Sequence, residues 1–367
     1  MHRAPKKYSE ALDWLDSRNQ NKIIPGLERI TKLMNIMGNP QKNLKLIVIG
    51  GTNAKGSTCF NLNHNLTRKG FKIGCFTSPH IHSARERIRI GNELIKIEEF
   101  TDILNSLKDI IEENYVKATY FEILTATAYQ YFHTKKVDYA IMEVGLGGEW
   151  DAVNIGDAEI AILTTLGIDH VEYLGNELEE IAITKAKIVR KDSDVITGWP
   201  KEYHNLIPKC KSLTYFENCK EWIEYTLEIL DIEQGIQLIN IPGRQEKVAN
   251  FVLDTAHNTQ AIQYLISQNK EYDKIIIGIM KDKDIRGIIS SLPENCEILT
   301  CNLKTERSAK SHDLAKICRE LGYQYKEFNN IKKAMKYSDN YKTLVTGSFH
   351  TISEARKYLN LKGHSEL

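Results

Sequence analysis

Short runs of apolar residues, each long enough for one buried strand, alternate with helical patterns along the chain. Four such runs occupy the first half of the sequence, at Leu44–Ile49, Phe71–Thr77, Tyr139–Val144 and Glu159–Thr165. Segments of helical periodicity follow or separate them, from the loop after Ile49 to Lys69, at Glu98–Glu113 and at Phe121–His133. Such alternation predicts a mostly parallel sheet that is covered by helices on both faces.

The same pattern starts again after Pro242-Gly243-Arg244. Strand-like runs then lie at Phe251–Asp254, Ile275–Ile279, Glu297–Cys301 and Thr343–Thr346, with helical segments near 258–269, 311–321 and 352–359. A Pro-Gly pair is a common feature of a hinge or a domain boundary. We therefore expect an α/β protein of two domains, residues 1–243 and a smaller one, residues 244–367.

The bulk composition is that of a soluble globular protein. Apolar residues make up 42% and charged residues 26% of the 367 residues, and a chain of this length usually forms two domains. The 49 basic and 48 acidic side chains leave a net charge of +1. A nucleic-acid-binding protein would usually carry a basic excess or stripe, so the charge gives no support for that class.

Two features argue against secretion and membrane insertion. The segment Met1–Lys7 leads into an amphipathic helical pattern with no apolar stretch behind it. The longest apolar runs, such as Leu46–Ile49, are far too short to span a bilayer. The seven cysteines are scattered and lack CxxC spacing, so we expect reduced thiols in a cytoplasmic protein rather than redox or metal sites.

The segment from Gly50 to Thr58 has the residues that a phosphate-binding loop needs. A strand ends in Gly50-Gly51, a short polar loop follows, and Lys55-Gly56-Ser57-Thr58 opens a helix. Glycines let the backbone approach an anion, and the N–H groups of a helix N-terminus point toward it. Lys55 adds a positive charge, and the hydroxyl of Ser57 or Thr58 can reach a nucleotide-bound Mg²⁺. A strand–turn–helix with incidental glycines is the alternative interpretation.

The lysine of this loop precedes the glycine, which reverses the usual Gly-Lys-Ser/Thr order. The sequence Gly51-Thr52-Asn53-Ala54-Lys55-Gly56-Ser57-Thr58 resembles the variant loop of the Mur ligase superfamily, and within it that of the folylpolyglutamate and dihydrofolate synthases. The family usually has glycine where this chain has Ala54. Further motifs similar to the family follow in the same order, among them Thr77-Ser78-Pro79-His80, Glu86-Arg87-Ile88, Glu143-Val144-Gly145-Leu146-Gly147-Gly148, Gly167-Ile168-Asp169-His170, Asp254-Thr255-Ala256-His257-Asn258, Lys283-Asp284 and Thr346-Gly347-Ser348.

The resemblance implies a fold and a reaction. The fold is a P-loop-containing, mostly parallel sheet domain of the Mur ligase central-domain type, followed by a smaller Rossmann-like α/β domain. In the reaction, a carboxylate attacks the γ-phosphate of ATP to give an acyl phosphate and ADP, and the amine of L-glutamate then displaces the phosphate. The expected substrates are ATP, L-glutamate and a pteroate or folate, with Mg²⁺ as the metal. A monomer is expected.

The resemblance also assigns metal ligands. Ser57, Glu143 and His170 match Mg²⁺ ligands of the family, although a nitrogen ligand is unusual for Mg²⁺. Glu143 ends the strand-like run Tyr139–Val144 and His170 follows another such run, and the carboxyl ends of parallel strands are where α/β sheets form ligand sites. Taken alone, Glu143 would be a solvated strand end and His170 a hydrogen-bonded loop histidine.

Lys185 matches a lysine that is typically carbamylated in the family, which would turn a cation into an anionic oxygen ligand. Its neighbours depart from the family, which usually has Glu in place of Thr184 and Gly in place of Lys187. Taken alone, Lys185 would be an ordinary surface lysine.

The remaining expected site residues belong to substrates. Arg244 and Asp254 match residues that hold the phosphates and ribose of ATP, because a guanidinium suits phosphate oxygens and a carboxylate suits a diol. Asn218 is a candidate adenine contact, in Glu217-Asn218-Cys219, where the family has a His-Gln before a helix.

His257 and Ser348 match positions near the incoming glutamate. Ser78 and His80 are candidates for contact with the glutamate or folate substrate, and the alternative for each is a structural residue of the loop. The alternative for Asp254–Asn258 is a helix N-cap after a strand, with Asn258 as the cap, and a cap and a ligand site can share one geometry.

Two departures leave other functions open. The family's Gly-Gly-Arg-x-Asp reads Gly148-Glu149-Trp150-Asp151 here, and the segment 194–241 is shorter than in the family. A nucleotide-binding homologue with lost or changed acceptor specificity is therefore the main alternative. A dinucleotide-dependent oxidoreductase lacks its GxGxxG motif here, and a P-loop kinase or GTPase would not explain the motifs after residue 242.

Overall fold

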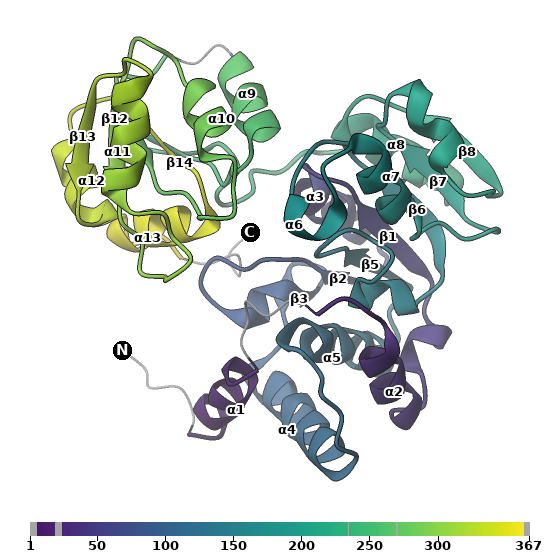
Figure 1. The fold of residues 1–367 in the computed structure, drawn as a ribbon. Coiled ribbons are helices and arrows are strands. Elements are labelled where there is room, and N and C mark those ends of the chain that lie inside the picture. The colour runs from purple at the N-terminus through teal and green to yellow at the C-terminus, as the bar shows by residue number, and fades with distance from the viewer. Residues whose placement is uncertain (1–5, 19–23, 234, 269–270, 363–367) are drawn as a thin grey trace. The chain divides into compact units, whose positions relative to one another are not determined.

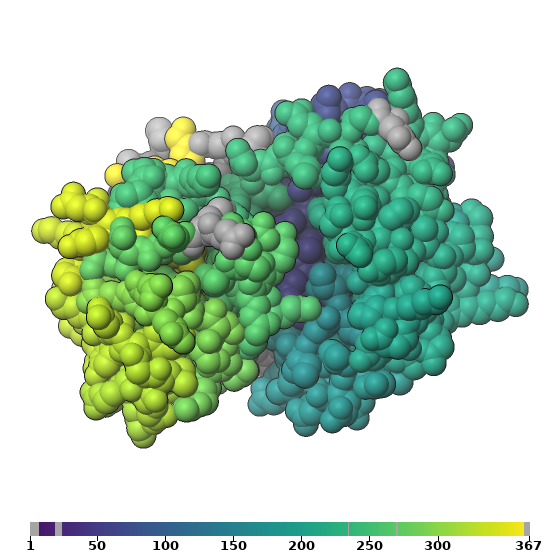
Figure 2. Space-filling model, turned by 90° about the horizontal axis from the view of Figure 1, so that it is seen from above, coloured from purple at the N-terminus to yellow at the C-terminus, as the bar shows by residue number. Residues whose placement is uncertain are grey.

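The computed structural model describes residues 6–18, 24–233, 235–268 and 271–362, and it divides into two compact units (Figure 1). Unit 1 comprises the chain up to His80, Ala84–Gly167 and Leu174–Ile239. Unit 2 comprises the chain from Asn240 onward together with two short segments, Ile81–Ser83 and Ile168–Tyr173. In the space-filling view, purple to teal atoms mark the earlier part of the chain, and green to yellow atoms mark unit 2 from Asn240 on (Figure 2).

Unit 1 contains one sheet with helices on both sides. Its strands are β1 (Leu46–Gly50), β2 (Ile73–Phe76), β3 (Ile88–Ile90), β4 (Glu93–Leu94), β5 (Tyr139–Glu143), β6 (Ala158–Leu163), β7 (Asp194–Thr197) and β8 (Ser212–Tyr215). Its helices are α1 (Lys6–Asp16), α2 (Glu28–Ile36), α3 (Lys55–Arg68), α4 (Ile97–Glu113), α5 (Tyr120–Lys135), α7 (Leu178–Ala186) and α8 (Cys219–Ile229), and the short α6 (Val171–Leu174) lies at the division between the units.

The strand order of this sheet is β4-β3-β2-β5-β1-β6-β7-β8. All neighbours from β2 to β8 pair in parallel, and β3 and β4 add an antiparallel edge. The central strand β1 is buried along its whole length, as its apolar sequence requires. Because β1, β5 and β2 are parallel neighbours, the loops that follow them leave the same edge of the sheet.

Each face of the sheet in unit 1 packs on its own set of helices. On one face, Val48, Met142 and Leu163 join a core with residues of α4 and α5. On the other, Ile49 and Ile162 pack with residues of α3 and α8 such as Leu62 and Trp222. Alternate residues of one strand thus enter different cores, which is the arrangement that the apolar runs predict.

Unit 2 repeats this architecture on a smaller sheet with the order β13-β12-β11-β14-β10-β9, in which only β9 is antiparallel to its neighbour. Its strands are β9 (Glu246–Val248), β10 (Phe251–Leu253), β11 (Lys274–Ile277), β12 (Glu297–Cys301), β13 (Tyr325–Phe328) and β14 (Thr343–Thr346). Its helices are α9 (Thr259–Ser267), α10 (Ile285–Ser290), α11 (Ser311–Glu320), α12 (Ile331–Tyr337) and α13 (Phe349–Tyr358). Residues of α9, α10 and α11 pack on one face, and those of α12 and α13 on the other.

The predicted fold class, a mostly parallel α/β sheet followed by a smaller α/β domain, is confirmed. Element bounds differ from the predicted ones by a few residues, and the end of the helix predicted near 258–269 lies outside the described residues. The short hairpin β3–β4 was not predicted, because Arg89 stands in the middle of β3 although it is buried. No helix among the described residues is long and apolar enough to cross a membrane.

Candidate active site

The predicted phosphate loop connects β1 to α3. Gly51 has φ +135°, and a Cβ at this position would lie 1.9 Å from the hydroxyl oxygen of Thr164, so only glycine fits. Ala54 has φ +66°, a left-handed conformation that is costly for a residue with a Cβ. Ala54 therefore occupies, in place of the family's usual glycine, a position whose backbone conformation favours glycine.

Backbone and hydroxyl contacts hold this loop in place. The amide of Thr52 donates to the carbonyl of Thr165 (2.7 Å), and its hydroxyl donates to the carbonyl of Gly167 (2.9 Å). The amide of Asn53 donates to the Thr165 hydroxyl (2.9 Å), and the Thr164 hydroxyl donates to the carbonyl of Asn53 (2.7 Å). The segment that follows β6 therefore fixes the loop before any ligand binds.

Two lysines direct their ammonium groups at the carbonyl oxygen of Gly51. Lys55 Nζ lies 3.0 Å and Lys185 Nζ lies 3.2 Å from this oxygen. Lys185 is only 4% exposed, so it is not the ordinary surface lysine that its sequence position alone suggests. Lys55 is partly exposed, and its positive charge beside a helix N-terminus makes the site favourable for an anion.

The hydroxyls in the first turn of α3 differ in their surroundings. Thr58 is fully buried, and its hydroxyl donates to the carbonyl of Ala54 (2.9 Å), with Cys219 Sγ 3.5 Å from the hydroxyl oxygen. Ser57 is partly exposed. Of the two, Ser57 is the better candidate for a ligand contact.

Glu143 ends β5, opposite Ile49 of β1, and is 3% exposed. Its carboxylate accepts a hydrogen bond from the amide of Ser78 (2.9 Å), in the loop that follows β2. His80 lies two residues further on and is partly exposed. The structure thus brings Glu143, Ser78 and the phosphate loop to one edge of the sheet in unit 1.

The loop Gly147–Asp151 packs closely against α7. A Cβ on Gly148 would lie 2.7 Å from the carbonyl oxygen of Thr184 and 2.8 Å from that of Lys185, so glycine is required for this approach. The amide of Glu149 donates to the carbonyl of Thr184 (3.0 Å). Glu149 itself is partly exposed, so its backbone anchors the loop while its side chain reaches the surface.

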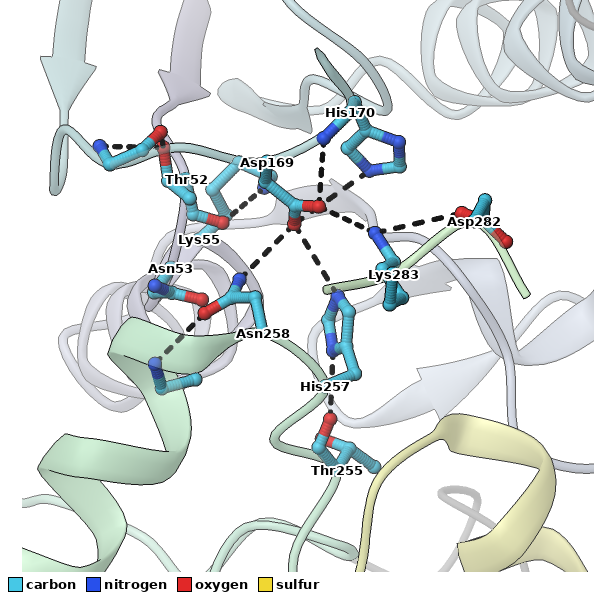
Figure 3. Close-up of polar contacts among 12 residues, drawn as sticks. Thr52, Asn53, Lys55, Asp169, His170, Thr255, His257, Asn258, Asp282 and Lys283 are labelled. Carbon is cyan, nitrogen blue, oxygen red and sulfur yellow. Dashed lines mark hydrogen bonds and ion pairs between the residues drawn. The ribbon is translucent and has the colours of Figure 1, made fainter. Parts of the chain in front are cut away.

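In unit 2, the carboxylate of Asp169 is the centre of a polar cluster (Figure 3). Lys283 Nζ lies 2.5 Å from Oδ1, and the side-chain amide of Asn258 donates to Oδ2 (3.1 Å). The Nε2 atoms of His257 and His170 lie 3.8 and 3.9 Å from Oδ2. This cluster holds the segment Ile168–Tyr173 on the loops that follow β10 and β11.

The charges of this cluster shift two pKa values. Burial would raise the pKa of Asp169, but the positive charges of His170, Lys283 and His257 hold it well below the ordinary value of 3.8. Burial and the charge of Lys283 lower the pKa of His257 from 6.5 to about 4, against the opposing effect of Asp169. His257 is therefore a neutral imidazole near pH 7, and its Nδ1 lies 2.9 Å from the carbonyl oxygen of Thr255.

The other predicted residues of unit 2 surround the start of α13 and β10. The Arg244 guanidinium lies 5.3 Å from the ring centre of Phe349, whose ring centre is 6.0 Å from that of His257. Ser348 is the N-cap of α13 and accepts from the amide of Thr351 (3.1 Å). Asp254 is 7% exposed and accepts hydrogen bonds from two backbone amides.

Two of the predicted site residues are helix N-caps, although only Asn258 was expected to be one. Asn258 accepts from the amide of Ala261 (2.8 Å) at the start of α9, and its side-chain nitrogen reaches Asp169 as well. Asn218 accepts from the amide of Glu221 (3.2 Å) at the start of α8, and it is exposed. Its predicted contact with adenine stays a prediction.

Among the motif residues to which no role was assigned are Asp169, Lys283 and Arg87. The pair of Asp169 and Lys283 is separated by 114 positions, so spacing cannot reveal it. The available signal was that each lies in a short polar motif directly after a strand-like run. Phe349 lay in none of the motifs.

Among the described residues, no group of three or more His, Cys, Asp or Glu side chains is placed to hold a metal ion. The predicted Mg²⁺ ligands in unit 1, Ser57 and Glu143, are a hydroxyl and a carboxylate at the same sheet edge, which are oxygen donors of the kind Mg²⁺ prefers. His170 belongs to unit 2.

Comparison with known proteins finds two family models in order along the chain. Residues 49–205 match the Mur ligase middle domain, and residues 242–349 match the Mur ligase glutamate ligase domain. The chain is 38% identical to the dihydrofolate synthase/folylpolyglutamate synthase of Bacillus subtilis, over 96% of this chain and 99% of that one. It is 29% identical to the Escherichia coli protein of the same name, over 98% of both.

Solved structures agree with these matches. Escherichia coli FolC in complex with DHPP and ADP has a TM-score of 0.88 and 25% identity, covering 97% of this chain and 99% of that one. The bifunctional folylpolyglutamate synthase/dihydrofolate synthase of Yersinia pestis, complexed with AMPPNP and a Mn ion, has a TM-score of 0.84 and 26% identity, covering 98% and 100%. Both family models and a near full-length relative therefore place the chain in the dihydrofolate synthase/folylpolyglutamate synthase family of Mur ligases.

Proposed function

We propose that the protein is an ATP-dependent ligase that joins L-glutamate through an amide bond to a carboxyl group of a pteroate or folate. It would act as a dihydrofolate synthase, a folylpolyglutamate synthase or both. The observation that carries the proposal is the 38% identity to the Bacillus subtilis enzyme over nearly the whole of both chains. The complexes of similar structures with ADP and AMPPNP support the use of ATP.

The reaction has two steps. An oxygen of the acceptor carboxylate attacks the γ-phosphorus of ATP, the bond to ADP breaks, and an acyl phosphate forms. The glutamate amine then attacks the carbonyl carbon, and phosphate leaves with the oxygen that came from the carboxylate. Negative charge develops on oxygen atoms in both steps, so positioning and positive charge are what the protein must supply.

Residues of the phosphate loop are suited to the phosphates of ATP. The backbone from Gly51 to Thr58 offers N–H groups at the start of α3, and Lys55 offers a flexible ammonium. Ser57 and Glu143, with His170 as a third ligand, would hold Mg²⁺, which supplies neutralisation of phosphate charge when bound.

Lys185 is proposed as a carbamylated lysine. Its burial and its closeness to Gly51 support a role at the nucleotide rather than at the surface. A carbamate on Lys185 would replace one of the two ammonium groups at the Gly51 carbonyl by an anion, which removes the repulsion between them.

In unit 2, Arg244 and Asp254 are proposed for the phosphates and ribose of ATP, and His257 and Ser348 for the incoming glutamate. The neutral state of His257 suits a hydrogen-bonding role better than a charge role. For the acceptor we propose Ser78 and His80 in unit 1, and for adenine Asn218. The protein is further proposed to be a cytoplasmic monomer.

ADP release tests this function. Purified protein with ATP and Mg²⁺ is incubated with dihydropteroate, tetrahydrofolate or an unrelated carboxylate, each with and without L-glutamate. We expect ADP release that requires both glutamate and one of the two pterin-containing acceptors. If the protein binds ATP but turns over none of the acceptors, the proposal is contradicted. That result would favour a nucleotide-binding homologue that has lost the activity.

A further inference from the structure

Arg87 is a buried cation beside the loop that follows β2 and carries Ser78 and His80. It is the last residue of a short 3-10 helix, η2 (Ala84–Arg87), and is 5% exposed. Its Nε donates a hydrogen bond to Nδ1 of His80 (3.0 Å), and its guanidinium lies 5.5 Å from the ring centre of Tyr120. Burial lowers the pKa of Arg87, while the charges of Tyr120, Glu143 and Glu86 raise it. The guanidinium stays charged, because its ordinary pKa is far above neutral.

The hydrogen bond from Arg87 determines where the proton of His80 lies. A guanidinium has only donors, so Nδ1 of His80 must accept and carries no proton. In a neutral imidazole the proton is then on Nε2. A second proton on Nδ1 would break the bond and place two cations within 3.0 Å of each other, so the charged imidazolium is disfavoured.

His80 lies at the edge of the sheet where the phosphate loop begins. It follows Ser78, whose amide binds the Glu143 carboxylate. Strand β2 pairs with β5, and β5 pairs with β1, all in parallel, so the residues after β2 and the phosphate loop leave the same edge. The partly exposed imidazole is therefore on the side of the sheet where ligands of such folds bind.

We propose that Arg87 is a positioning residue that fixes His80 as the neutral tautomer with its proton on Nε2. His80 then serves the ligase as a hydrogen-bond donor to a ligand oxygen. It cannot act as the base that accepts a proton from the glutamate amine, because Nδ1 is occupied by Arg87 and Nε2 carries a proton. The role of His80 as a donor to the ligand rests on the proposed ligase function, whereas the assignment of its tautomer does not.

In both steps of the reaction, such a donor can stabilise negative charge that develops on oxygen. Oxygens of the acceptor carboxyl group and of the transferred phosphoryl group gain negative charge as the acyl phosphate forms and collapses. A fixed N–H donor stabilises that charge without reorganisation, and loss of one such donor typically costs about 100-fold in rate. A charged histidine would instead form an ion pair with the ground-state carboxylate as well, which lowers KM without the same gain in kcat.

The tautomer is tested by ¹⁵N NMR of the full chain labelled at histidine, at neutral pH, with the His80 signals identified by their loss in His80→Gln. We expect His80 to show a protonated Nε2 and an unprotonated Nδ1. Arg87→Met should mix the tautomers or protonate the ring. Arg85→Met is the matched control, because Arg85 lies on the same 3-10 helix but its Nε donates to the carbonyl of Ile95 (2.8 Å).

A proton on Nδ1 in the unmodified protein, or unchanged His80 signals in a folded Arg87→Met variant, would overturn the assignment. The measurement on the unmodified protein decides the tautomer even where Arg87→Met does not fold.

Activity tests the donor role. Glutamine can place an amide N–H near the position of Nε2, so His80→Gln should keep kcat within about tenfold, whereas His80→Ala should lose about 100-fold. Equal losses in both variants would overturn the donor role. If no acceptor supports turnover but the tautomer is as expected, the proposed function fails and the assignment of Arg87 stands.

Discussion

At the scale of single residues, the Asp169 cluster shows how a buried carboxylate holds a loop in place. Its carboxylate gathers Lys283, Asn258 and two histidines, which keeps the segment Ile168–Tyr173 on unit 2 although β6, directly before it in sequence, belongs to unit 1. The ion pair with Lys283 is almost fully buried, so removing one partner would leave an uncompensated charge. The conformation of this segment therefore depends on the ionisation of Asp169 and Lys283.

The stability of unit 2 should depend on His257 in a defined pH range. Its pKa is about 4 in the folded protein and 6.5 ordinarily, so between these values the unfolded chain binds a proton that the folded chain does not. The free energy of unfolding therefore falls as the pH falls from 6.5 to 4. His257→Asn, which does not titrate, should flatten this part of the pH profile.

The measurement is urea unfolding followed by far-UV circular dichroism, because the four tryptophans, at positions 14, 150, 199 and 222, all belong to unit 1. His312→Asn is the control, since this histidine is 77% exposed. Equal pH slopes in His257→Asn and the unmodified protein would show that His257 does not carry the effect.

At the scale of elements, α3 supports two parts of unit 1 at once. Its N-terminus forms the phosphate loop, and its Asn65 pairs with both backbone groups of Gln237 (2.8 and 2.9 Å). Asn61 accepts from the amide of Ile239 (2.8 Å), the last residue of unit 1. One helix thus holds the site and the segment that leads to unit 2.

The start of α3 carries conformational strain that a substitution can relieve. Ala54 precedes the helix with φ +66°, which costs a residue with a Cβ about 1 kcal/mol. Glycine adopts this conformation freely but loses more entropy on folding, so Ala54→Gly should stabilise unit 1 by about 0.5 kcal/mol. Urea unfolding followed by tryptophan fluorescence measures the change.

Ala128→Gly in α5 is the matched control. Ala128 is buried inside a right-handed helix, where the same exchange should destabilise by about 1 kcal/mol or more. The strain argument would be wrong if Ala54→Gly lowered the stability as much as Ala128→Gly does.

The local sequence predicted those strands whose apolar residues form one continuous run. The apolar runs at β1, β5, β12 and β14 are buried strands, and polar motifs follow several of them. Strand β3 escaped prediction because Arg89, 1% exposed, lies against the ring of Phe60 and not in solvent. Contacts such as that of Lys283 with Asp169 depend on the topology of the chain, which no local pattern encodes.

The site was predictable to a similar degree. Residues in contiguous motifs, such as the phosphate loop and Glu143, lie together at one sheet edge in unit 1. The burial of Lys185 and the tautomer of His80 were not accessible, because both depend on neighbours that are distant in sequence or belong to another element.

At the scale of the whole molecule, two α/β units and a near full-length match to known synthases support a single activity. The alignment with the Bacillus subtilis protein spans 425 positions, whereas this chain has 367 residues, so the relative carries residues that this chain lacks. The two family models nevertheless cover both units. We infer that the chain retains the parts that ligation requires.

The fate of the carboxylate oxygen tests this account most directly. The protein is incubated with ATP, Mg²⁺, L-glutamate and dihydropteroate labelled with ¹⁸O in its carboxyl group, or a reduced folate labelled in its γ-carboxyl group, and the released phosphate is analysed by mass spectrometry. We predict that one ¹⁸O atom passes to phosphate for each amide bond formed, because the carboxylate oxygen attacks the γ-phosphorus. Unlabelled phosphate released alongside ADP would contradict the acyl-phosphate route.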